Sequence, residues 1–407
     1  MKRFLAALLA ALTVFTLTGC GKTENPAEPV TPGQGEEPAA PTEPELTPEE
    51  IAEQERLAAE KAREERLQGL LDSMTLEEKV GQLFFVRCPE ENAVEDISTY
   101  HLGGYLLFGR DYKDGDSWLT WDQFIQKIES YQDAAAIPLF IGSDEEGGTV
   151  SRVGSNPDMG VPSVGDMRSL GKQQDPAAAY AAGQDIGGSL HALGFNLDFA
   201  PVADVAQGAD SVIGSRSFGS DPELCASLAG VIVKSLRAEG IVSCLKHFPG
   251  YGSATVDDHN GTSIVEKTLS ELEGCDLVPF QSIIASEGSV PFVMVSHLSY
   301  PNVTGSDTPA DLSASIVTDI LRDKLDYQNV IITDSHSMAS ITDHYSAGDA
   351  AVKALAAGCD MILMPSDLQA AFDAVKAAVA DGALSQARID ESVLRILTVK
   401  AEYGIIS

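Results

Sequence analysis

The feature that most constrains the fold of this chain is a repeated alternation of short apolar runs with longer helical patterns. Eight runs of strand length are near-continuously apolar, as expected of parallel strands that are buried on both faces. The runs span residues 82–86, 105–108, 138–142, 196–200, 242–247, 292–296, 330–334 and 361–364. Because helical patterns separate them, the sequence predicts an α/β fold in which eight parallel strands close into a (β/α)8 barrel, the TIM barrel.

The helical segments carry recognisable start signals. Pro176 and Pro222 each follow an aspartate, which is the arrangement of an N-cap residue followed by the first helical residue. The predicted helices span residues 121–134, 176–193, 222–238, 270–285, 312–325, 347–357, 368–380 and 389–403.

The first 20 residues predict a secretion signal. Lys2 and Arg3 precede an apolar segment, residues 4–17, that is too short to span a bilayer as a helix. Residues 17–20 resemble a bacterial lipobox, which implies that Cys20 is lipidated and becomes the mature N-terminus. The alternative is an ordinary secretory signal with an incidental cysteine. The lipobox interpretation predicts an extracytoplasmic lipoprotein that is held to the cell membrane by its lipid anchor alone.

The next segment, residues 21–48, holds seven prolines and six glutamates and few apolar side chains. Such a composition cannot bury enough surface to offset its ordering entropy, so we predict a disordered tether. Residues 49–69 predict an N-terminal helix, because Pro48 and two glutamates form a helix start. We expect residues 70–407 to form one barrel domain.

Charge and cysteine usage exclude several classes of function. The formal net charge of −34 argues against nucleic acid and against an anionic membrane surface as partners. After Cys20, an odd number of cysteines, scattered in apolar runs, predicts buried free thiols rather than a disulfide framework. These cysteines are Cys88, Cys225, Cys244, Cys275 and Cys359. We also expect the protein to be a monomer.

The fifth apolar run ends in a stretch rich in groups that can do chemistry. Residues 246–252 read Lys-His-Phe-Pro-Gly-Tyr-Gly, and the proline and glycines end the strand and open a loop. That loop carries Asp257, Asp258 and His259. Polar residues also follow other apolar runs, and barrel active sites lie at these carboxyl ends of the strands. The sequence therefore predicts a catalytic rim there.

This stretch and the Asp-x-His that follows resemble glycoside hydrolase family three, in its β-N-acetylglucosaminidase branch. The resemblance extends from about residue 70 to the end of the chain. It implies a (β/α)8 barrel and a retaining exo-β-N-acetylhexosaminidase that hydrolyses terminal β-linked N-acetylglucosamine. The expected substrates are peptidoglycan fragments or other cell-surface glycans. Three alternatives stay open: the identity of the natural glycan, a preference for N-acetylglucosamine or for N-acetylgalactosamine, and transfer of the sugar to water (hydrolysis) or to phosphate (phosphorolysis).

The resemblance also implies the catalytic residues. Asp334 ends the run 330–334 within a pattern that resembles the family's nucleophile motif, so it would form the covalent glycosyl intermediate. The alternative role for Asp334 is an N-cap of the next helix. His259 would protonate the leaving oxygen and later activate water, and Asp257 would orient its ring.

Further residues are implied to bind substrate. Residues 143–152 and 214–222 resemble two family loops, and an ion pair between Glu146 and Arg152 is expected to support the first. Asp204 is expected to be a buried structural acid. Tyr251, Asp258 and His336 depart from the family pattern, and His336 is expected beside the nucleophile. The implied substrate-binding residues are Asp144, Arg152, Arg216, Lys246, His247 and His297. The alternative for His297 is a purely structural role, and the alternative for Lys246 and His247 is a core ion pair that closes the barrel.

Other functions remain open from the sequence. A β-glucosidase would lack the Asp-x-His dyad, and an inactive sugar-binding lipoprotein would not need the nucleophile. A Schiff-base aldolase using Lys246 would require a desolvated lysine, which neighbouring acids disfavour. No cofactor is expected, and no metal site is predicted because the sequence has no His-Glu-x-x-His pattern.

Overall fold

The computed structural model describes residues 46–208, 211–254, 263–286 and 290–407. The chain divides into two units, residues 1–55 and residues 56–407. The described part of the first unit is residues 46–55, which include the opening turns of helix α1 (Pro48–Ser73) and are exposed. The second unit holds the rest of α1, where Leu67 and Leu71 are buried, and all the other elements.

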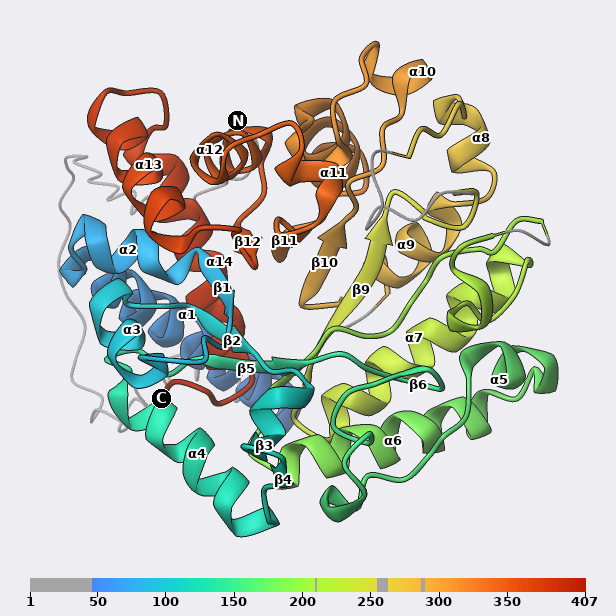
Figure 1. Cartoon of the computed structure of the whole chain (residues 1–407), viewed down its shortest axis with the longest axis horizontal. Helices are drawn as coiled ribbons and strands as arrows, with labels where there is room; N and C mark the ends of the chain where they lie inside the picture. Colours follow the sequence, from blue (N-terminus) through green and yellow to red (C-terminus); the bar gives the residue numbers. More distant parts are fainter. Residues whose placement is uncertain (1–45, 209–210, 255–262, 287–289) are drawn as a thin grey trace, which may run out of the picture. The chain divides into compact units, whose positions relative to one another are not determined.

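Eight parallel strands form a closed barrel in the second unit (Figure 1), which confirms the predicted fold. Their order around the barrel is β1-β12-β11-β10-β9-β8-β5-β2. Each barrel strand therefore pairs with the barrel strands that come before and after it in the chain, and β12 pairs with β1 to close the barrel. The observed boundaries differ from the predicted ones by at most two residues, and four of the strands begin where they were predicted to begin. The strands are β1 (Phe84–Arg87), β2 (Gly104–Leu106), β5 (Phe140–Ser143), β8 (Leu197–Asp198), β9 (Val242–Phe248), β10 (Phe292–Val295), β11 (Val330–Ser335) and β12 (Met361–Leu363).

Helices surround the barrel, and their starts follow local sequence signals. In α4, the side chains of Thr120 and Gln123 form a reciprocal capping box, and Asp221 caps α7 ahead of Pro222. The longer helices are α2 (Leu76–Gln82), α3 (Ala93–Tyr100), α4 (Trp121–Ala134), α5 (Met167–Gln173), α6 (Pro176–Ala192), α7 (Pro222–Ala238), α12 (Ala347–Ala357), α13 (Leu368–Ala380) and α14 (Gln386–Glu402).

Four predicted helices differ from the structure by three residues or more or in their type, and one of them is α14, which begins three residues before its predicted start. The segment 270–285 is two helices, α8 (Leu269–Glu273) and α9 (Leu277–Ile284). The segment 312–325 contains η6 (Ser315–Lys324), a helix of the wider π type rather than an α-helix. The N-terminal helix α1 runs to Ser73, four residues beyond its predicted end.

Aromatic side chains fill the interior of the barrel. The Phe85 ring, from β1, meets the Phe199 ring edge-on with centroids 5.0 Å apart, and Phe140, from β5, meets Phe292, from β10, at 5.2 Å. All four side chains are fully buried. Because the barrel is a packed core rather than a pore, a ligand can enter only at its ends.

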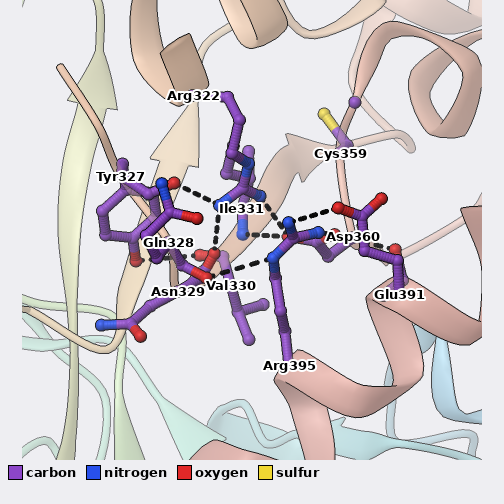
Figure 2. A network of polar contacts seen from close by, with 12 residues as sticks. Arg322, Tyr327, Gln328, Asn329, Val330, Ile331, Cys359, Asp360, Glu391 and Arg395 are labelled. Atoms are coloured by element: carbon purple, nitrogen blue, oxygen red, sulfur yellow. Dashed lines mark hydrogen bonds and ion pairs between the residues drawn. The ribbon is translucent and has the colours of Figure 1, made fainter. Parts of the chain in front are cut away.

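A buried charge network lies where strands β11 and β12 begin (Figure 2). Asp360, the residue before β12, accepts hydrogen bonds from Arg322 at 2.7 Å, Arg388 at 3.1 Å and Arg395 at 3.1 Å. Burial raises the pKa of Asp360, but the three arginines outweigh it and hold the pKa below its usual value. Glu391 binds Arg395 in turn. The network ties η6 and α14 to the first residues of β11 and β12.

Five cysteines in the described residues are free thiols, and all except the half-buried Cys275 are buried, as predicted. Among the described helices, none combines the length and apolar character needed to cross a membrane.

Candidate active site

A cavity of about 670 Å³ opens at the end of the barrel where the strands finish. Its wall includes Asp334 from β11 and Lys246 and His247 from β9. Asp144, which follows β5, and Arg216, from the short helix η3 (Gly214–Arg216), complete the polar part. The structure thus brings together five of the residues predicted from separate strand ends.

Glu146 is the centre of the charge network in this cavity. It lies on β6 (Glu145–Gly147), which forms a small hairpin with β7 (Val150–Ser151), and it is 3% exposed. Its carboxylate accepts two hydrogen bonds of 2.8 Å from Arg216 and lies 2.6 Å from the Lys246 Nζ. Burial raises the pKa of Glu146, but Lys246 and Arg216 together hold it well below its usual range. Glu146 therefore fixes two cations in place as a carboxylate.

Lys246 links the network to Asp144. Its Nζ donates to Asp144 Oδ1 at 2.8 Å, and the side chain is 3% exposed. Burial lowers the pKa of Lys246, but Asp144 and Glu146 outweigh it and raise the pKa above its usual range. Because Lys246 is an ammonium with two carboxylate partners, it cannot serve as the neutral amine that Schiff-base chemistry requires. It can still donate hydrogen bonds into the cavity.

His247 is oriented by Asp204 rather than by a solvent contact. Its Nδ1 lies 2.7 Å from Asp204 Oδ2, and Asp204 is fully buried, the structural role that was predicted for it. Asp204 also accepts the backbone N–H of Tyr251 at 2.6 Å. The other ring nitrogen, Nε2, lies 3.4 Å from Arg216 Nη2. At Gly252 a Cβ would lie 1.8 Å from the Val205 carbonyl oxygen, so glycine is required there for this close packing.

Asp334 lies near the end of β11 with its carboxylate in the cavity wall. The backbone N–H of Ser335 donates to its Oδ1 at 2.7 Å. Burial raises the pKa of Asp334, but the charges of His247 and His297, the Ser335 hydrogen bond and Lys246 lower it below its usual value. An ionised, oriented carboxylate at this place is what a nucleophile of a retaining glycosidase requires.

The predicted acid/base dyad, His259 and Asp257, lies outside the described residues, as does Asp258. The described chain ends at Ala254 and resumes at Ser263. The roles of these three residues stay predictions.

Arg152 also lines the cavity, but its predicted ion pair with Glu146 is wrong. Glu146 instead pairs with Arg216 and Lys246, which are distant in sequence and reach it from η3 and β9. The Arg152 guanidinium carbon lies 5.7 Å from the centroid of the Phe108 ring, and its Nε is buried without a hydrogen-bond partner. Arg87 lies 4.9 Å from the same ring, again in the cavity wall.

His297 and His336 do not line the cavity. His297 therefore has the structural role that was the alternative to substrate contact, and the expected place of His336 beside the nucleophile's subsite is wrong. Both side chains are at most 1% exposed and lie against the buried Asp311. His297 turns inward because its Nε2 bonds the Ser335 carbonyl at 2.9 Å, and His336 because its Nε2 bonds Asp311 at 2.8 Å.

Sequence reasoning missed several residues of the cavity wall. Arg87 could have been found, because it directly follows the first apolar run and so stands at a strand end. Met294, Met338 and Met364 supply an apolar part of the wall that no local pattern distinguishes from core. Within the described part of the chain, no cluster of three or more His, Cys, Asp or Glu side chains is arranged to hold a metal ion.

Several known proteins are similar to this chain in sequence and in fold. Residues 75–399 match the profile of the Glycosyl hydrolase family 3 N terminal domain. The chain is 34% identical over 334 residues to Beta-hexosaminidase A of Pseudoalteromonas piscicida, covering 76% of this chain and 54% of that protein. It is also 34% identical to Beta-hexosaminidase LpqI of Mycobacterium tuberculosis, covering 79% of this chain and 82% of that protein. The chain thus spans about half the length of the Pseudoalteromonas protein.

Among solved structures, a family 3 β-N-acetylglucosaminidase from Paenibacillus sp. str. FPU-7 superposes with a TM-score of 0.76 at 35% identity. That match covers 82% of this chain and 63% of the other. LpqI of M. tuberculosis superposes with a TM-score of 0.72 at 32% identity, covering 82% of this chain and 96% of the other.

Proposed function

This chain belongs to glycosyl hydrolase family 3, and on that premise we propose that it is a retaining exo-β-N-acetylhexosaminidase that releases terminal β-linked N-acetylglucosamine. The observation that carries the proposal is Asp334, an ionised carboxylate in the wall of a cavity whose other polar groups suit a sugar. The names of similar proteins, β-hexosaminidases and a β-N-acetylglucosaminidase, support the same activity.

In the proposed mechanism, Asp334 attacks the anomeric carbon and the bond to the leaving oxygen breaks, which gives a covalent glycosyl-enzyme. His259, oriented by Asp257, gives its proton to the leaving oxygen. It then takes a proton from a water that attacks the anomeric carbon, which breaks the bond to Asp334 and frees its carboxylate. Two displacements restore the β configuration. Asp144, Lys246 and the other polar groups of the cavity wall would bind hydroxyl groups.

Arg216 and His247 would complete the sugar contacts. Arg216 is held in place by Glu146 yet keeps 29% of its side chain exposed. His247 presents Nε2 beside it. Because their partners already fix both side chains, they would lose little conformational entropy when a sugar binds.

Two arginines in the cavity wall, Arg87 and Arg152, support the proposal that the substrate is an acidic glycan such as a peptidoglycan fragment. Neither guanidinium forms an ion pair within the described residues, although the whole chain carries a net charge of −34. Unpaired arginines in a cavity wall suit a carboxylate on the aglycone, because guanidinium binds carboxylate in a bidentate manner. N-acetylmuramic acid carries such a carboxylate on its lactyl group.

Hydrolysis of aryl β-glycosides tests the activity. Wild-type protein should cleave the β-N-acetylglucosaminide, and Asp334→Ala should lose nearly all turnover while melting at an unchanged temperature. Faster cleavage of the β-glucoside would instead support a β-glucosidase. No cleavage of any glycoside, with N-acetylglucosamine still bound, would support an inactive sugar-binding lipoprotein.

The acidic aglycone is tested by comparing N-acetylglucosaminyl-N-acetylmuramic acid with chitobiose. Arg87→Gln and Arg152→Gln should each reduce kcat/KM for the acidic disaccharide by about tenfold and spare chitobiose. Lys113→Gln removes a cation outside the cavity wall and is the matched control. An equal loss on both disaccharides would exclude a carboxylate contact.

A further inference from the structure

Three buried titratable side chains that do not line the cavity form a cluster that the proposed mechanism does not use. His297 follows β10, Asp311 lies in the short helix η5 (Ala310–Leu312) and His336 follows β11. Their exposed fractions are 0%, 0% and 1%. The Asp311 carboxylate lies between the two rings, with Oδ1 at 3.1 Å from His297 Nδ1 and Oδ2 at 2.8 Å from His336 Nε2. We call these three residues the His-Asp-His cluster.

The hydrogen bonds and the ion pair of the cluster indicate where its protons lie. A carbonyl oxygen only accepts, so His297 Nε2, which is 2.9 Å from the Ser335 oxygen, must carry a hydrogen. His297 Nδ1 lies 3.1 Å from Asp311 Oδ1, an ion-pair distance at which neither atom makes an aligned hydrogen bond, and a second proton on Nδ1 makes His297 an imidazolium beside its counter-ion. Burial lowers the pKa of His297, but Asp311 outweighs it and raises the pKa to about 9.

His336 supplies the second donor to Asp311 and remains neutral. Its Nε2–H binds Oδ2, and its Nδ1 is buried without a partner, so a second proton on that atom would have no acceptor. Burial lowers the pKa of His336 below its usual value. Burial raises the pKa of Asp311, but the two histidines outweigh it and lower the pKa to about 2. The cluster thus holds one anion and one cation, with His336 fixing the orientation of the carboxylate.

Ser335 connects the cluster to the nucleophile. Its carbonyl oxygen accepts from His297, and its N–H donates to Asp334 Oδ1 at 2.7 Å. The backbone of Ser335, which orients the nucleophile, is therefore held by a hydrogen bond at its carbonyl group and by another at its N–H group. The charged or titratable groups that act on Asp334 are His247 and Lys246 from β9 and His297 from the cluster.

We propose that Asp311 is a positioning residue for the nucleophile: it holds His297 as an imidazolium that is linked to Asp334 through Ser335, which keeps the Asp334 carboxylate ionised and in place. Asp311 does not touch substrate, because the cluster lies outside the cavity wall. The inference rests on the proposed function, since its readout is glycoside hydrolysis.

The pH dependence of kcat/KM on an aryl β-N-acetylglucosaminide tests this role. In Asp311→Asn, His297 loses its counter-ion and its charge, so the acid limb should move up by about one pH unit. His297→Gln keeps a donor to the Ser335 carbonyl but cannot be charged, so the same shift is expected. The inhibition constant of N-acetylglucosamine should stay within about twofold, because no sugar contact is removed.

Asp360→Asn is the matched control. It also replaces a fully buried, hydrogen-bonded aspartate, but at the opposite end of the barrel. It should lower stability and leave the acid limb unchanged. An acid limb that does not move in Asp311→Asn and His297→Gln, or one that moves equally in Asp360→Asn, would overturn the proposal.

Histidine ¹⁵N NMR of the wild-type protein tests the cluster without any need for activity in a variant. His297, assigned from the signal that disappears in His297→Gln, should be doubly protonated at pH 8. A neutral His297 at pH 7 would refute the proposal. If the wild-type protein hydrolyses no glycoside, the proposed function fails, and the NMR result still decides whether the cluster holds an imidazolium.

Discussion

Lys400 is a fully buried lysine for which we predict a stability effect that changes with pH. Its Nζ donates to Gln82 Oε1 at 2.7 Å and lies 5.1 Å from the centroid of the Phe140 ring. Within the described residues it forms no ion pair with a carboxylate. Burial lowers the pKa of Lys400 from 10.5 to about 7. The ammonium form is therefore costly in the folded state.

The size of this cost follows from proton linkage. A folded-state pKa near 7, against 10.5 in the unfolded chain, destabilises the fold by roughly 5 kcal/mol at pH 6. The cost diminishes as pH rises through 7, because the folded state then loses its proton while the unfolded state keeps it. Between pH 6 and pH 9 the recovery is about 3 kcal/mol.

Lys400→Met removes the charge and keeps the length of the side chain. It leaves Gln82 Oε1 without its donor, which costs about 1–3 kcal/mol at either pH. At pH 6 the variant should thus be more stable than wild type by about 2–4 kcal/mol. At pH 9 the two proteins should be nearly equal.

Urea unfolding of the full chain at pH 6 and pH 9 measures the difference. Lys79→Met is the matched control, because Lys79 is also buried but lies 2.8 Å from Asp390, so its loss should destabilise at both pH values. A Lys400→Met variant that is less stable than wild type at pH 6, or whose advantage is equal at pH 6 and pH 9, would refute the reasoning.

Three further predictions concern the proposed mechanism and anchor. The sugar first formed should be the β anomer by proton NMR, and an α product would exclude Asp334 as nucleophile. His259→Ala should slow glycosides with poor leaving groups far more than activated aryl glycosides, which need little protonation; an equal loss on both would exclude His259 as the acid. Cys20→Ala should move the protein from the membrane fraction to the soluble fraction, and its retention in membranes would contradict a lipid anchor at that residue.

The sequence by itself determined the barrel and the edge on which its polar residues lie. A parallel strand buried on both faces must be apolar along its whole length, so runs such as 330–334 and 242–247 are visible without any tertiary information. The carboxyl ends of such strands meet at one end of a barrel. Asp334, Lys246 and His247 could therefore be assigned to one site from their positions in the chain.

Only the tertiary structure decided which charged groups pair. Glu146 was expected to bind Arg152, six residues away, but it binds Arg216 and Lys246, which other barrel elements bring to it. Likewise His336 stands two residues beyond Asp334, yet it turns away from the cavity to bind Asp311. Asp311 carries no local signal of its role. A buried charge is stable only beside its counter-charge, and the barrel's closure sets which counter-charge is within reach.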